Sequence, residues 1–502
     1  MEILQNFYHG FQFAIIPANL FYCFFGVLTG TLIGVLPGIG PIGAMSLLLP
    51  LTYKATALQA IVMLAGIYYG AMYGGSTTSI LVNIPGEAAS VVTCLDGYQM
   101  ARKGRAGAAL GISAFGSFIA GTAGIIGLMF LGPPLASFAL KIGPPEFFSI
   151  LCVGLTMVVF LTMGSIIRAL IMAFFGIILG CIGQDLETGV SRFAFGTIYL
   201  TGGIDLVPFI MGLFGISEVL LNVEKGLARN TVMQTEIKGI LPNLKDWRNS
   251  IGAILRGSLL GFLLGIIPGG GVVISSFSSY AMEKKLSKHP EKFGKGAIEG
   301  VAGPESANNA AAMGAFVPLF TLGIPAQVSM AILLGALLIH GVTPGPMMMG
   351  KNPEIFWGVV ASMWIGNGML LILNLPLISL WVQVLRVPYK ILFPLILLIC
   401  IIGSYSINNN VFDIIVMLIF GVLGYLMRKY GYEGAPMVLA FVLGPMFENS
   451  LRQSLLLSDG SFMIFFNRPI AAVGMIVTML IFISCFAPFL RKKREEIPLE
   501  GS

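Results

Sequence analysis

The sequence predicts an all-α polytopic membrane protein built from two inverted repeats, with broken helices and re-entrant hairpins. Three observations lead to this prediction. The chain is 56% hydrophobic and only 10% charged, with a mean hydropathy of +0.90. A pattern of glycine and proline in the first half recurs in the second half. Corresponding loops of the two halves carry opposite charge bias, which places them on opposite sides of a bilayer.

The composition excludes a soluble enzyme and limits the number of membrane spans. A span needs about 20 apolar residues, so the 502 residues allow roughly ten to thirteen spans. The net charge of +6 lies mainly in short loops, where basic residues act as topology signals. We therefore expect a lipid bilayer as partner and no nucleic acid. The six cysteines lack the spacing of metal ligands, so no metal site is expected.

Polarity along the chain divides it into four parts. Residues 1–221 form the first transmembrane half and residues 252–490 the second. Residues 222–251, the least hydrophobic stretch, are interpreted as a cytoplasmic connector, and both an amphipathic surface helix and an ordinary solvated loop fit their pattern. Residues 491–502 are expected to form a basic cytoplasmic tail.

An internal repeat relates the two halves. Six residues each match an identical residue 231 positions later: Gly26, Gly30, Gly34, Pro37, Gly38 and Gly40 match Gly257, Gly261, Gly265, Pro268, Gly269 and Gly271. Further on, we pair the polar run 76–79 with 306–309, and the run 83–85 with 323–325. These two pairings require ten extra residues in the second half, between its polar run and its Ile-Pro.

The charges of corresponding loops indicate that the repeat is inverted. The loop around Lys54 has one basic residue, whereas its counterpart, residues 283–295, has five lysines. After the next segment the bias reverses, with Arg102, Lys103 and Arg105 in the first half against Lys351 in the second. Opposite orientation of two repeats is the architecture of many secondary transporters.

The same rule predicts two re-entrant hairpins. Residues 252–282 lie between two cytoplasmic segments, and their two apolar pieces are too short for two full spans. A hairpin with its tip at 268–271 resolves this, and its repeat partner would have its tip at 37–40.

Polar residues cluster within the membrane segments, above all in the stretch 66–90. Small residues that only allow close helix packing would explain its glycines and some hydroxyls. They do not explain the run 83–87, Asn-Ile-Pro-Gly-Glu, so we favour a substrate or ion site.

Broken helices could bind an anion through the free N–H groups of half-helix N-termini, where proline is well tolerated. The dipeptides Pro37-Gly38, Pro85-Gly86, Pro268-Gly269 and Pro325-Ala326 fit such positions. Hydroxyls and amides beside them could donate to carboxylates or ligate a cation such as sodium. The full set of candidate residues is Pro37, Gly38, Gly40, Ser76, Thr77, Thr78, Ser79, Asn83, Pro85, Gly86, Glu87, Pro268, Gly269, Gly270, Gly271, Glu305, Ser306, Asn308, Asn309, Pro325 and Gln327.

Two acids in this set, Glu87 and Glu305, could ligate a coupling cation or carry a proton. The alternative is a carboxylate in the first turn of a helix, where the helix dipole favours it. Enzyme signatures such as HExxH, GxSxG and GxxxxGK[ST] do not occur, so no catalytic residue is expected. The alternative functions are a passive carboxylate channel and an intramembrane hydrolase. The hydrolase would need Ser79 or Ser306 as nucleophile, and no paired histidine is visible in the sequence.

At these motifs the sequence resembles the large membrane subunit of the tripartite tricarboxylate transporter (TctA) family. The similarity rests on the segments GVLPGIGP, YYGAMYGGSTTSILVNIPGEAAS with DGYQMARKGRAG, GIIPGGG, and GPESANNAAAMGAFVPLFTLGIPAQ.

The resemblance implies a multi-pass carrier of the bacterial inner membrane with a cytoplasmic C-terminus. It also implies two partners, a small membrane subunit and a periplasmic solute-binding protein. The substrates would be di- or tricarboxylates such as citrate, with uptake driven by a sodium or proton gradient and no other cofactor. The identity of the carboxylate, the coupling ion and the oligomeric state stay open.

Overall fold

The computed structural model of the chain describes residues 2–36, 40–162, 165–185, 188–224, 239–384 and 389–486. Three predictions lie wholly or partly outside these residues. They are the candidates Pro37 and Gly38, which also belong to the predicted hairpin tip at 37–40, the basic tail 491–502, and residues 225–238 of the connector 222–251.

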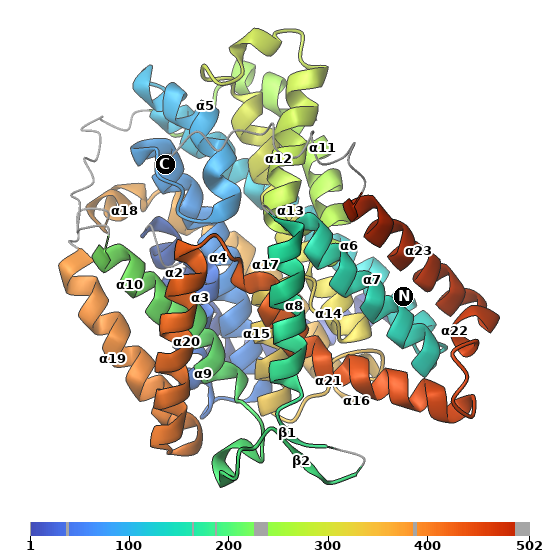
Figure 1. Ribbon diagram of the computed structural model, residues 1–502. Helices are drawn as coiled ribbons and strands as arrows, with labels where there is room; N and C mark the ends of the chain where they lie inside the picture. The colour runs from blue at the N-terminus through green and yellow to red at the C-terminus, as the bar shows by residue number, and fades with distance from the viewer. Residues whose placement is uncertain are drawn as a thin grey trace. The chain divides into compact units, whose positions relative to one another are not determined.

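The chain forms two compact units, and each unit draws on both halves of the sequence. The first unit comprises Met1–Ala139 and Asp205–Leu426, and the second comprises Leu140–Ile204 and Met427–Ser502. Both are built of helices (Figure 1). Within the described residues the only strands are β1 (Gly183–Gln184) and β2 (Ser191–Arg192), which pair antiparallel. The prediction of an all-α membrane protein is confirmed.

The helices of the first unit, with α20 ending just beyond it, are α1 (Glu2–Ala14), α2 (Pro17–Val35), α3 (Gly40–Leu48), η1 (Leu49–Thr52), α4 (Ala57–Val82), η2 (Ala88–Ser90), α5 (Val91–Arg102), α6 (Ala106–Ala139), α9 (Leu206–Ile210), the π-helical η4 (Met211–Ile216), α10 (Ser217–Glu224), α11 (Leu244–Ile266), α12 (Gly271–Leu286), η5 (Pro290–Lys292), α13 (Glu299–Gly314), α14 (Phe316–Leu322), α15 (Val328–Ile339), α16 (Met348–Lys351), α17 (Pro353–Asn374), α18 (Ile378–Val384), α19 (Tyr389–Asn408) and α20 (Val411–Lys429). Those of the second unit are α7 (Pro144–Leu161), α8 (Ile166–Gly180), η3 (Ile198–Leu200), α21 (Gly434–Leu457), α22 (Ile464–Asn467) and α23 (Pro469–Phe486).

Among the described residues, eight helices are long and apolar enough to cross a membrane, and five further apolar helices are shorter. The number of full-length helices is below the predicted ten to thirteen because several apolar segments are broken. The core of the first unit lies around α4, whose apolar window is 89% buried. A helix that is apolar on all sides in this way must be surrounded by protein or lipid.

The repeat is visible in how glycines on one helix meet the backbone of the next. A Cβ atom on Gly26, Gly30 or Gly34 of α2 would collide with the carbonyl oxygens of Met63, Ile67 and Ala71 on α4, respectively. A Cβ atom on Gly257, Gly261 or Gly265 of α11 would collide in the same way with Gly303, Ala307 and Ala311 on α13. The matched glycines therefore allow two pairs of helices to pack with their backbones in contact.

These contacts correct one predicted pairing. The contacted residues 63, 67 and 71 correspond to 303, 307 and 311, so the offset in residue number is the same for all three. This offset also relates Asn83 (φ 59°) to Gly323 (φ 72°), the left-handed residues that end α4 and α14. No ten-residue slip is needed, so Ser76–Ser79 and Ser306–Asn309 are not equivalent positions. The pairing of the Ile-Pro segments at 84–85 and 324–325 holds.

The second predicted hairpin is formed by α11 and α12, which lie side by side in Figure 1. Arg256 donates from Nε and Nη2 to the two carboxylate oxygens of Glu283, at 2.8 and 2.6 Å. Arg256 precedes Pro268 by as many positions as Glu283 follows Gly271. This bidentate pair joins the two legs in antiparallel orientation, with the tip at Pro268–Gly271. The first leg is longer than predicted, because α11 begins in the polar connector, and with 23 residues it is by itself long enough to cross a membrane.

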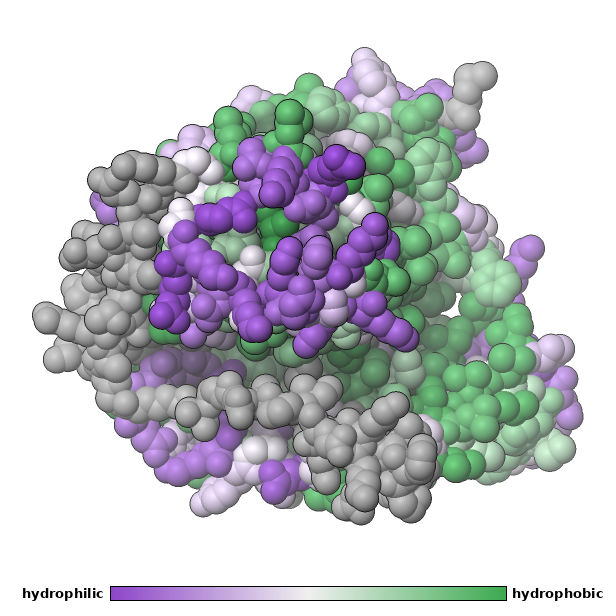
Figure 2. All heavy atoms as spheres, turned by 90° about the horizontal axis from the view of Figure 1, so that it is seen from above, coloured by the Kyte–Doolittle hydropathy of each residue, from purple (hydrophilic) through white to green (hydrophobic). Residues whose placement is uncertain are grey.

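The basic loops that were predicted to share one side of the membrane do lie together. Lys103 Nζ donates to the carbonyl of Lys295 at 2.5 Å, and Arg105 pairs with Asp246 at the start of α11. The buried carboxylate of Asp96 accepts hydrogen bonds from the backbone N–H groups of Gly294, Gly296 and Ala297 and from the hydroxyl of Tyr280. Figure 2 shows hydrophilic residues gathered on this face. In the segment bonded to Asp96 and Lys103, the lysines 284, 285, 288, 292 and 295 are exposed.

The second unit has its own polar cluster. Arg192 and Arg452 form ion pairs with Asp185 and Glu448, around a cavity of about 350 Å³. At another place in this unit, Arg468 pairs with the buried Glu146. Each acid here has a cationic partner, so these clusters are explained as structural ion pairs.

Candidate functional site

Glu305 lies at the centre of the polar region and is buried on α13. Its side chain accepts hydrogen bonds from Ser76 Oγ on α4, at 2.5 Å, and from Thr93 Oγ1 on α5. Glu305 is 1% exposed and lies in the middle of α13, not in its first turn. The alternative of a dipole-stabilised helix N-terminal carboxylate therefore does not apply to it.

Thr78 and Ser79 of the run 76–79 donate to backbone carbonyls. Thr78 donates to the carbonyl of Val35 at 2.6 Å, which ties α4 to the end of α2. Ser79 donates to the carbonyl of Gly75 within its own helix at 3.0 Å. Close packing thus accounts for these two hydroxyls, whereas Ser76 contacts a side chain of the other repeat.

Glu87 lies in the loop between α4 and α5 and is 7% exposed. Its Oε2 accepts from the backbone N–H of Ala89 at 2.6 Å, so Glu87 is the N-cap of η2. Its Oε1 accepts from Asn308 Nδ2 on α13 at 3.1 Å. Glu87 therefore caps a helix turn, as the alternative interpretation expected, and it also reaches a polar side chain of the other repeat. Its role as a cation ligand or proton carrier stays a prediction.

Gln327 occupies the position in the second repeat that Glu87 occupies in the first, by the offset that relates Asn83 to Gly323. It is the N-cap of α15, and its Nε2 donates to the hydroxyl of Tyr68 on α4. Tyr68 is in turn the counterpart of Asn308 at the same offset. The bonds Asn308–Glu87 and Tyr68–Gln327 are therefore equivalent under the repeat, and each joins a helix of one repeat to the loop of the other.

The hairpin tip of the second repeat contacts this region through its backbone. Gly269 N donates to the carbonyl of Ala326 at 2.9 Å, next to Gln327. A Cβ atom on Gly271 (φ 49°) would lie 3.3 Å from Gln327 Oε1. In the first repeat, Gly40 has the corresponding positive φ of 64°. Glycine is required at such φ values next to a close side chain.

The proline positions differ from the predicted half-helix starts. Helices begin at Ala88 and Val328, after the N-caps Glu87 and Gln327, so Pro85 and Pro325 precede the first turn. Each proline instead belongs to a short link between a left-handed helix end and an N-cap. Asn83 is exposed, and its left-handed conformation, which asparagine tolerates, explains its residue type without a ligand.

Three buried oxygens at the site have no hydrogen-bond partner among the described residues. They are Ser306 Oγ, Asn308 Oδ1 and Asn309 Oδ1, all on α13. The amide of Asn309 donates to Ser117 Oγ at 2.8 Å and to the carbonyl of Glu305 at 3.1 Å. Buried polar atoms are almost always paired, so unpaired oxygens at a polar cluster indicate where a ligand or water binds.

The site contains acids and no buried basic residue among the described residues. Every Asp, Glu, Lys or Arg that is buried in the described part of the chain is an acid. Of these, Glu146, Asp185, Asp246 and Glu283 have an arginine partner. Glu87 and Glu305 have only neutral donors among the described residues, and the same holds for Asp96 and Asp413 outside the site. Such an environment favours a bound cation or proton, because a buried carboxylate without a cationic partner is costly.

The sequence interpretation missed Tyr68, Thr93 and Ser117. Tyr68 is polar only at its hydroxyl and stands in an apolar run, so composition did not mark it. Only the repeat could have marked it, because the correspondence of residues 63, 67 and 71 with 303, 307 and 311 also matches Tyr68 with the candidate Asn308. Thr93 and Ser117 are single hydroxyls on α5 and α6, and only the fold places them at the site.

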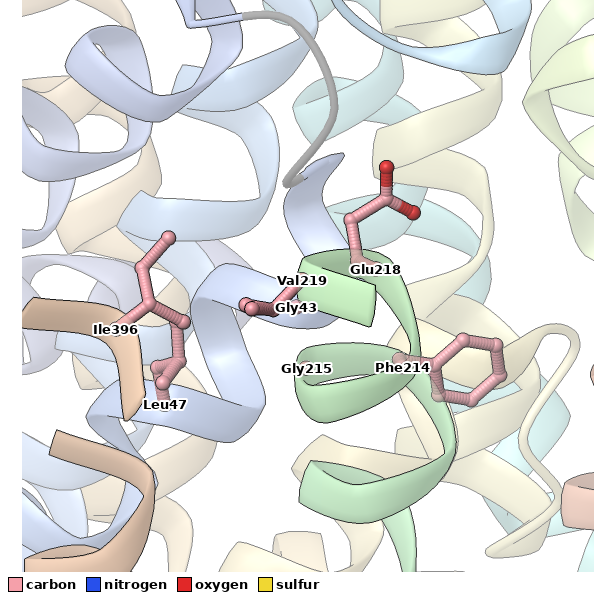
Figure 3. A pocket seen from close by; sticks show the side chains of 7 residues that line it. All are labelled: Gly43, Leu47, Phe214, Gly215, Glu218, Val219 and Ile396. Carbon is pink, nitrogen blue, oxygen red and sulfur yellow. The ribbon is translucent and has the colours of Figure 1, made fainter. Parts of the chain in front are cut away.

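The cavity shown in Figure 3 lies elsewhere in the first unit. It is lined by Gly43, Leu47, Phe214, Gly215, Glu218, Val219 and Ile396 and has a volume of about 10 Å³. The carboxylate of Glu218 points away from Leu47 and Ile396. This volume is that of about one water-sized sphere, so the cavity is too small for a carboxylate substrate.

The chain is similar to a known family of membrane transporters and to two proteins of one bacterium. Residues 20–439 match the family model described as "Tripartite tricarboxylate transporter TctA family". An uncharacterized 52.8 kDa protein in the TAR-I ttuC' 3'region of Agrobacterium vitis is 49% identical over 500 residues, which cover 100% of this chain and 99% of that protein. An uncharacterized protein in the TAR-II ttuC' 3'region of the same organism is 52% identical over 240 residues, 48% of this chain and 99% of that protein. No solved structure matches with significance.

Proposed function

The chain belongs to the tripartite tricarboxylate transporter TctA family, and from this premise we propose that it is the large membrane subunit of a cation-coupled uptake system for di- and tricarboxylates. A small membrane subunit and a periplasmic solute-binding protein would complete the system. The inner membrane is the expected location, with the C-terminus in the cytoplasm. Membership of a transporter family also fits the expectation that the chain is not an enzyme.

One observation supports this proposal above all, namely the pair of repeat-related hydrogen bonds at the buried site. Asn308–Glu87 and Tyr68–Gln327 each connect one repeat to the other. A carrier with inverted repeats exchanges two conformations by moving one set of elements relative to the other, and it binds substrate at their interface. Contacts that cross between repeats are the ones that such a movement would break and remake.

Burial favours a carrier over the alternative, a passive carboxylate channel. Nine polar side chains of the site are at most 7% exposed, whereas Gln327 is partly exposed. The nine are Ser76, Thr77, Thr78, Ser79, Glu87, Glu305, Ser306, Asn308 and Asn309. A substrate can reach them only after helices or loops move. A channel with this site would need a continuous wet path along the same residues.

Negative charge at the site supports coupling to a cation. Glu87 and Glu305 would repel a di- or tricarboxylate unless a cation or proton neutralises them. Binding of the cation would then favour binding of the anion, which is the requirement for symport. Sodium and protons both meet this requirement.

The antiparallel hairpin further suggests an elevator-like movement, in which the hairpin tips and the loops after α4 and α14 move together across the membrane. Cysteine cross-linking in states with and without substrate would test this. Displacement of the Gly269 region along the membrane normal is expected, and a fixed depth in both states would exclude an elevator.

The decisive experiment for the proposed function is uptake of labelled citrate into proteoliposomes that contain this chain, its small partner and the binding protein. An imposed sodium gradient should drive uptake, and omission of the binding protein should abolish it. Sodium-independent uptake would indicate protons, and flux without any gradient or binding protein would indicate a channel. If citrate is not accumulated, succinate and malate are tested in the same way.

A further inference from the structure

The two repeat-related hydrogen bonds differ in chemical character. In the first, the loop residue is the acid Glu87 and the helix residue is Asn308, whose Oδ1 is unpaired and fully buried. In the second, the loop residue is the neutral Gln327 and the helix residue is Tyr68. The two bonds therefore lie at equivalent positions of the repeats but join different kinds of side chain.

The groups at Glu87 offer oxygen lone pairs. A carboxylate and an amide oxygen are the ligands that hard cations such as sodium prefer. Asn308 Oδ1 belongs to the same amide whose Nδ2 lies 3.1 Å from Glu87 Oε1, so the unpaired oxygen is next to the carboxylate. Rotation of this amide would exchange its N–H for its oxygen, and both Asn308 Oδ1 and Glu87 would then face the same point.

The groups at Gln327 are hydrogen-bond donors. Gln327 Nε2 uses one N–H on Tyr68, where the hydroxyl oxygen accepts. The second N–H of Gln327 and the O–H of Tyr68 remain available to an acceptor, and none is seen for them among the described residues. A hydroxyl and an amide N–H are suitable donors to a carboxylate. The tip of the hairpin is adjacent, since Gly269 bonds the neighbouring Ala326.

From this difference we propose that the repeats have diverged into a cation half-site and an anion half-site. A hard monovalent cation binds between Glu87 and Asn308 Oδ1, and one carboxylate of the substrate binds to the Tyr68 hydroxyl and the Gln327 amide. This inference rests on the proposed function and assigns a separate role to each half of its site. One cation is therefore bound by this pair of positions in each cycle, because Gln327 cannot supply the second negative charge.

Separate binding measurements on the purified complex of this chain with its small subunit test the division. Sodium chloride alone should raise the temperature of unfolding relative to equal concentrations of potassium or choline chloride, because a ligand stabilises the state that binds it. Citrate, added at a constant sodium concentration, should raise it further.

The variants should dissociate the two responses. Glu87→Gln gives the first repeat the residue type that Gln327 has in the second. This variant should bind sodium with an apparent affinity that is lower by about tenfold or more. It should keep a response to citrate. Tyr68→Phe and Gln327→Ala should weaken the citrate response and keep the sodium response. Glu291→Gln, which changes an exposed acid of η5, is the matched control and should keep both.

Three results would overturn the proposal. They are a sodium response that survives Glu87→Gln, a wild type that responds to pH but not to sodium, and variants that each lose both responses while remaining monodisperse. Exchange of labelled for unlabelled citrate in the full proteoliposome system, without a cation gradient, keeps the two proposals distinguishable. If the wild type shows no citrate exchange, the proposed function fails. If it exchanges citrate but the variants do not lose the sodium and citrate responses separately, only the division into half-sites is refuted.

Discussion

Ser76 on α4 donates a hydrogen bond of 2.5 Å to the carboxylate of Glu305 on α13, although the two residues are 229 positions apart in the chain. The bond joins the two repeats at the most buried acid of the site. Its counterpart under the repeat does not exist, since Ala65 and Phe316 stand at the equivalent positions. Glu305 is therefore a feature of one repeat only, like Glu87.

Replacement of Ser76 by alanine should weaken transport without loss of membrane insertion. The substitution leaves a buried carboxylate with one hydroxyl donor fewer, and a hydrogen bond to a charged group contributes about 1.5–3 kcal/mol. Initial citrate uptake at low concentration should fall about tenfold or more, at normal abundance in the membrane. Ser406→Ala, which removes an exposed hydroxyl bonded within α19, is the control. Normal uptake by Ser76→Ala would refute the role of this bond.

Asn309→Ala should also weaken uptake, because it removes the unpaired Oδ1 from the site. The comparison with Ser117→Ala separates this role from packing. Ser117 is the side-chain partner of the Asn309 amide, and its loss leaves Oδ1 in place. We expect a smaller effect from Ser117→Ala, of about threefold or less in uptake, on the scale of a net neutral hydrogen bond. Equal effects of the two variants would assign Asn309 to structure.

Gly261→Ala should destabilise the first unit. A Cβ atom at this position would collide with the backbone of Ala307, which has no flexible side chain that could yield. Overpacking of this kind costs about 1–3 kcal/mol. Gly368→Ala on α17 is the control, since a Cβ atom there meets nothing within 4 Å. Thermal unfolding of the two purified variants should give a lowered midpoint for Gly261→Ala alone, and equal midpoints would contradict the close packing of α11 on α13.

Asp96→Ala should loosen the segment around residues 294–297. The substitution leaves three backbone N–H groups without their acceptor. That of Ala297 is buried, and a buried unpaired group costs about 1–3 kcal/mol. Hydrogen exchange of these amides should accelerate. Tyr280→Phe removes only one donor to the same carboxylate and should leave these amides protected. Unchanged exchange in Asp96→Ala would show that the segment is held by other contacts.

Much of this architecture could be predicted from the sequence because it depends on local rules. Glycines at every fourth position of α2 and α11 indicated close helix packing, and loop charges placed Lys103 and Lys295 on one side, where they are in contact. The tip at Pro268–Gly271 was likewise predictable from its length and flanking charges. The Arg256–Glu283 pair then fixes the legs of that hairpin.

The pairing of polar residues across the repeats was not predictable in the same way. Residue similarity suggested that Ser76–Ser79 and Ser306–Asn309 correspond, because both runs are polar. Backbone contacts between α2 and α4 and between α11 and α13 show a different correspondence, in which polar Asn308 matches aromatic Tyr68. A repeat preserves backbone geometry more strictly than side-chain chemistry, so the exchange of Glu87 for Gln327 could be recognised only once the helix ends were placed.

The Arg256–Glu283 pair provides the last prediction. Glu283 is 3% exposed and Arg256 is 45% exposed at their side chains, so the two partners should respond unequally to removal. Arg256→Ala leaves a buried carboxylate without a cation and should lower stability strongly, because breaking a buried pair by removing one partner is costly. Glu283→Ala leaves an arginine that can turn to solvent and should cost less. In the double variant the penalty of the lone carboxylate disappears, so its unfolding temperature should lie above that of Arg256→Ala. Additive losses in the double variant would mean that the two side chains are not coupled and that the hairpin legs are held together by packing alone.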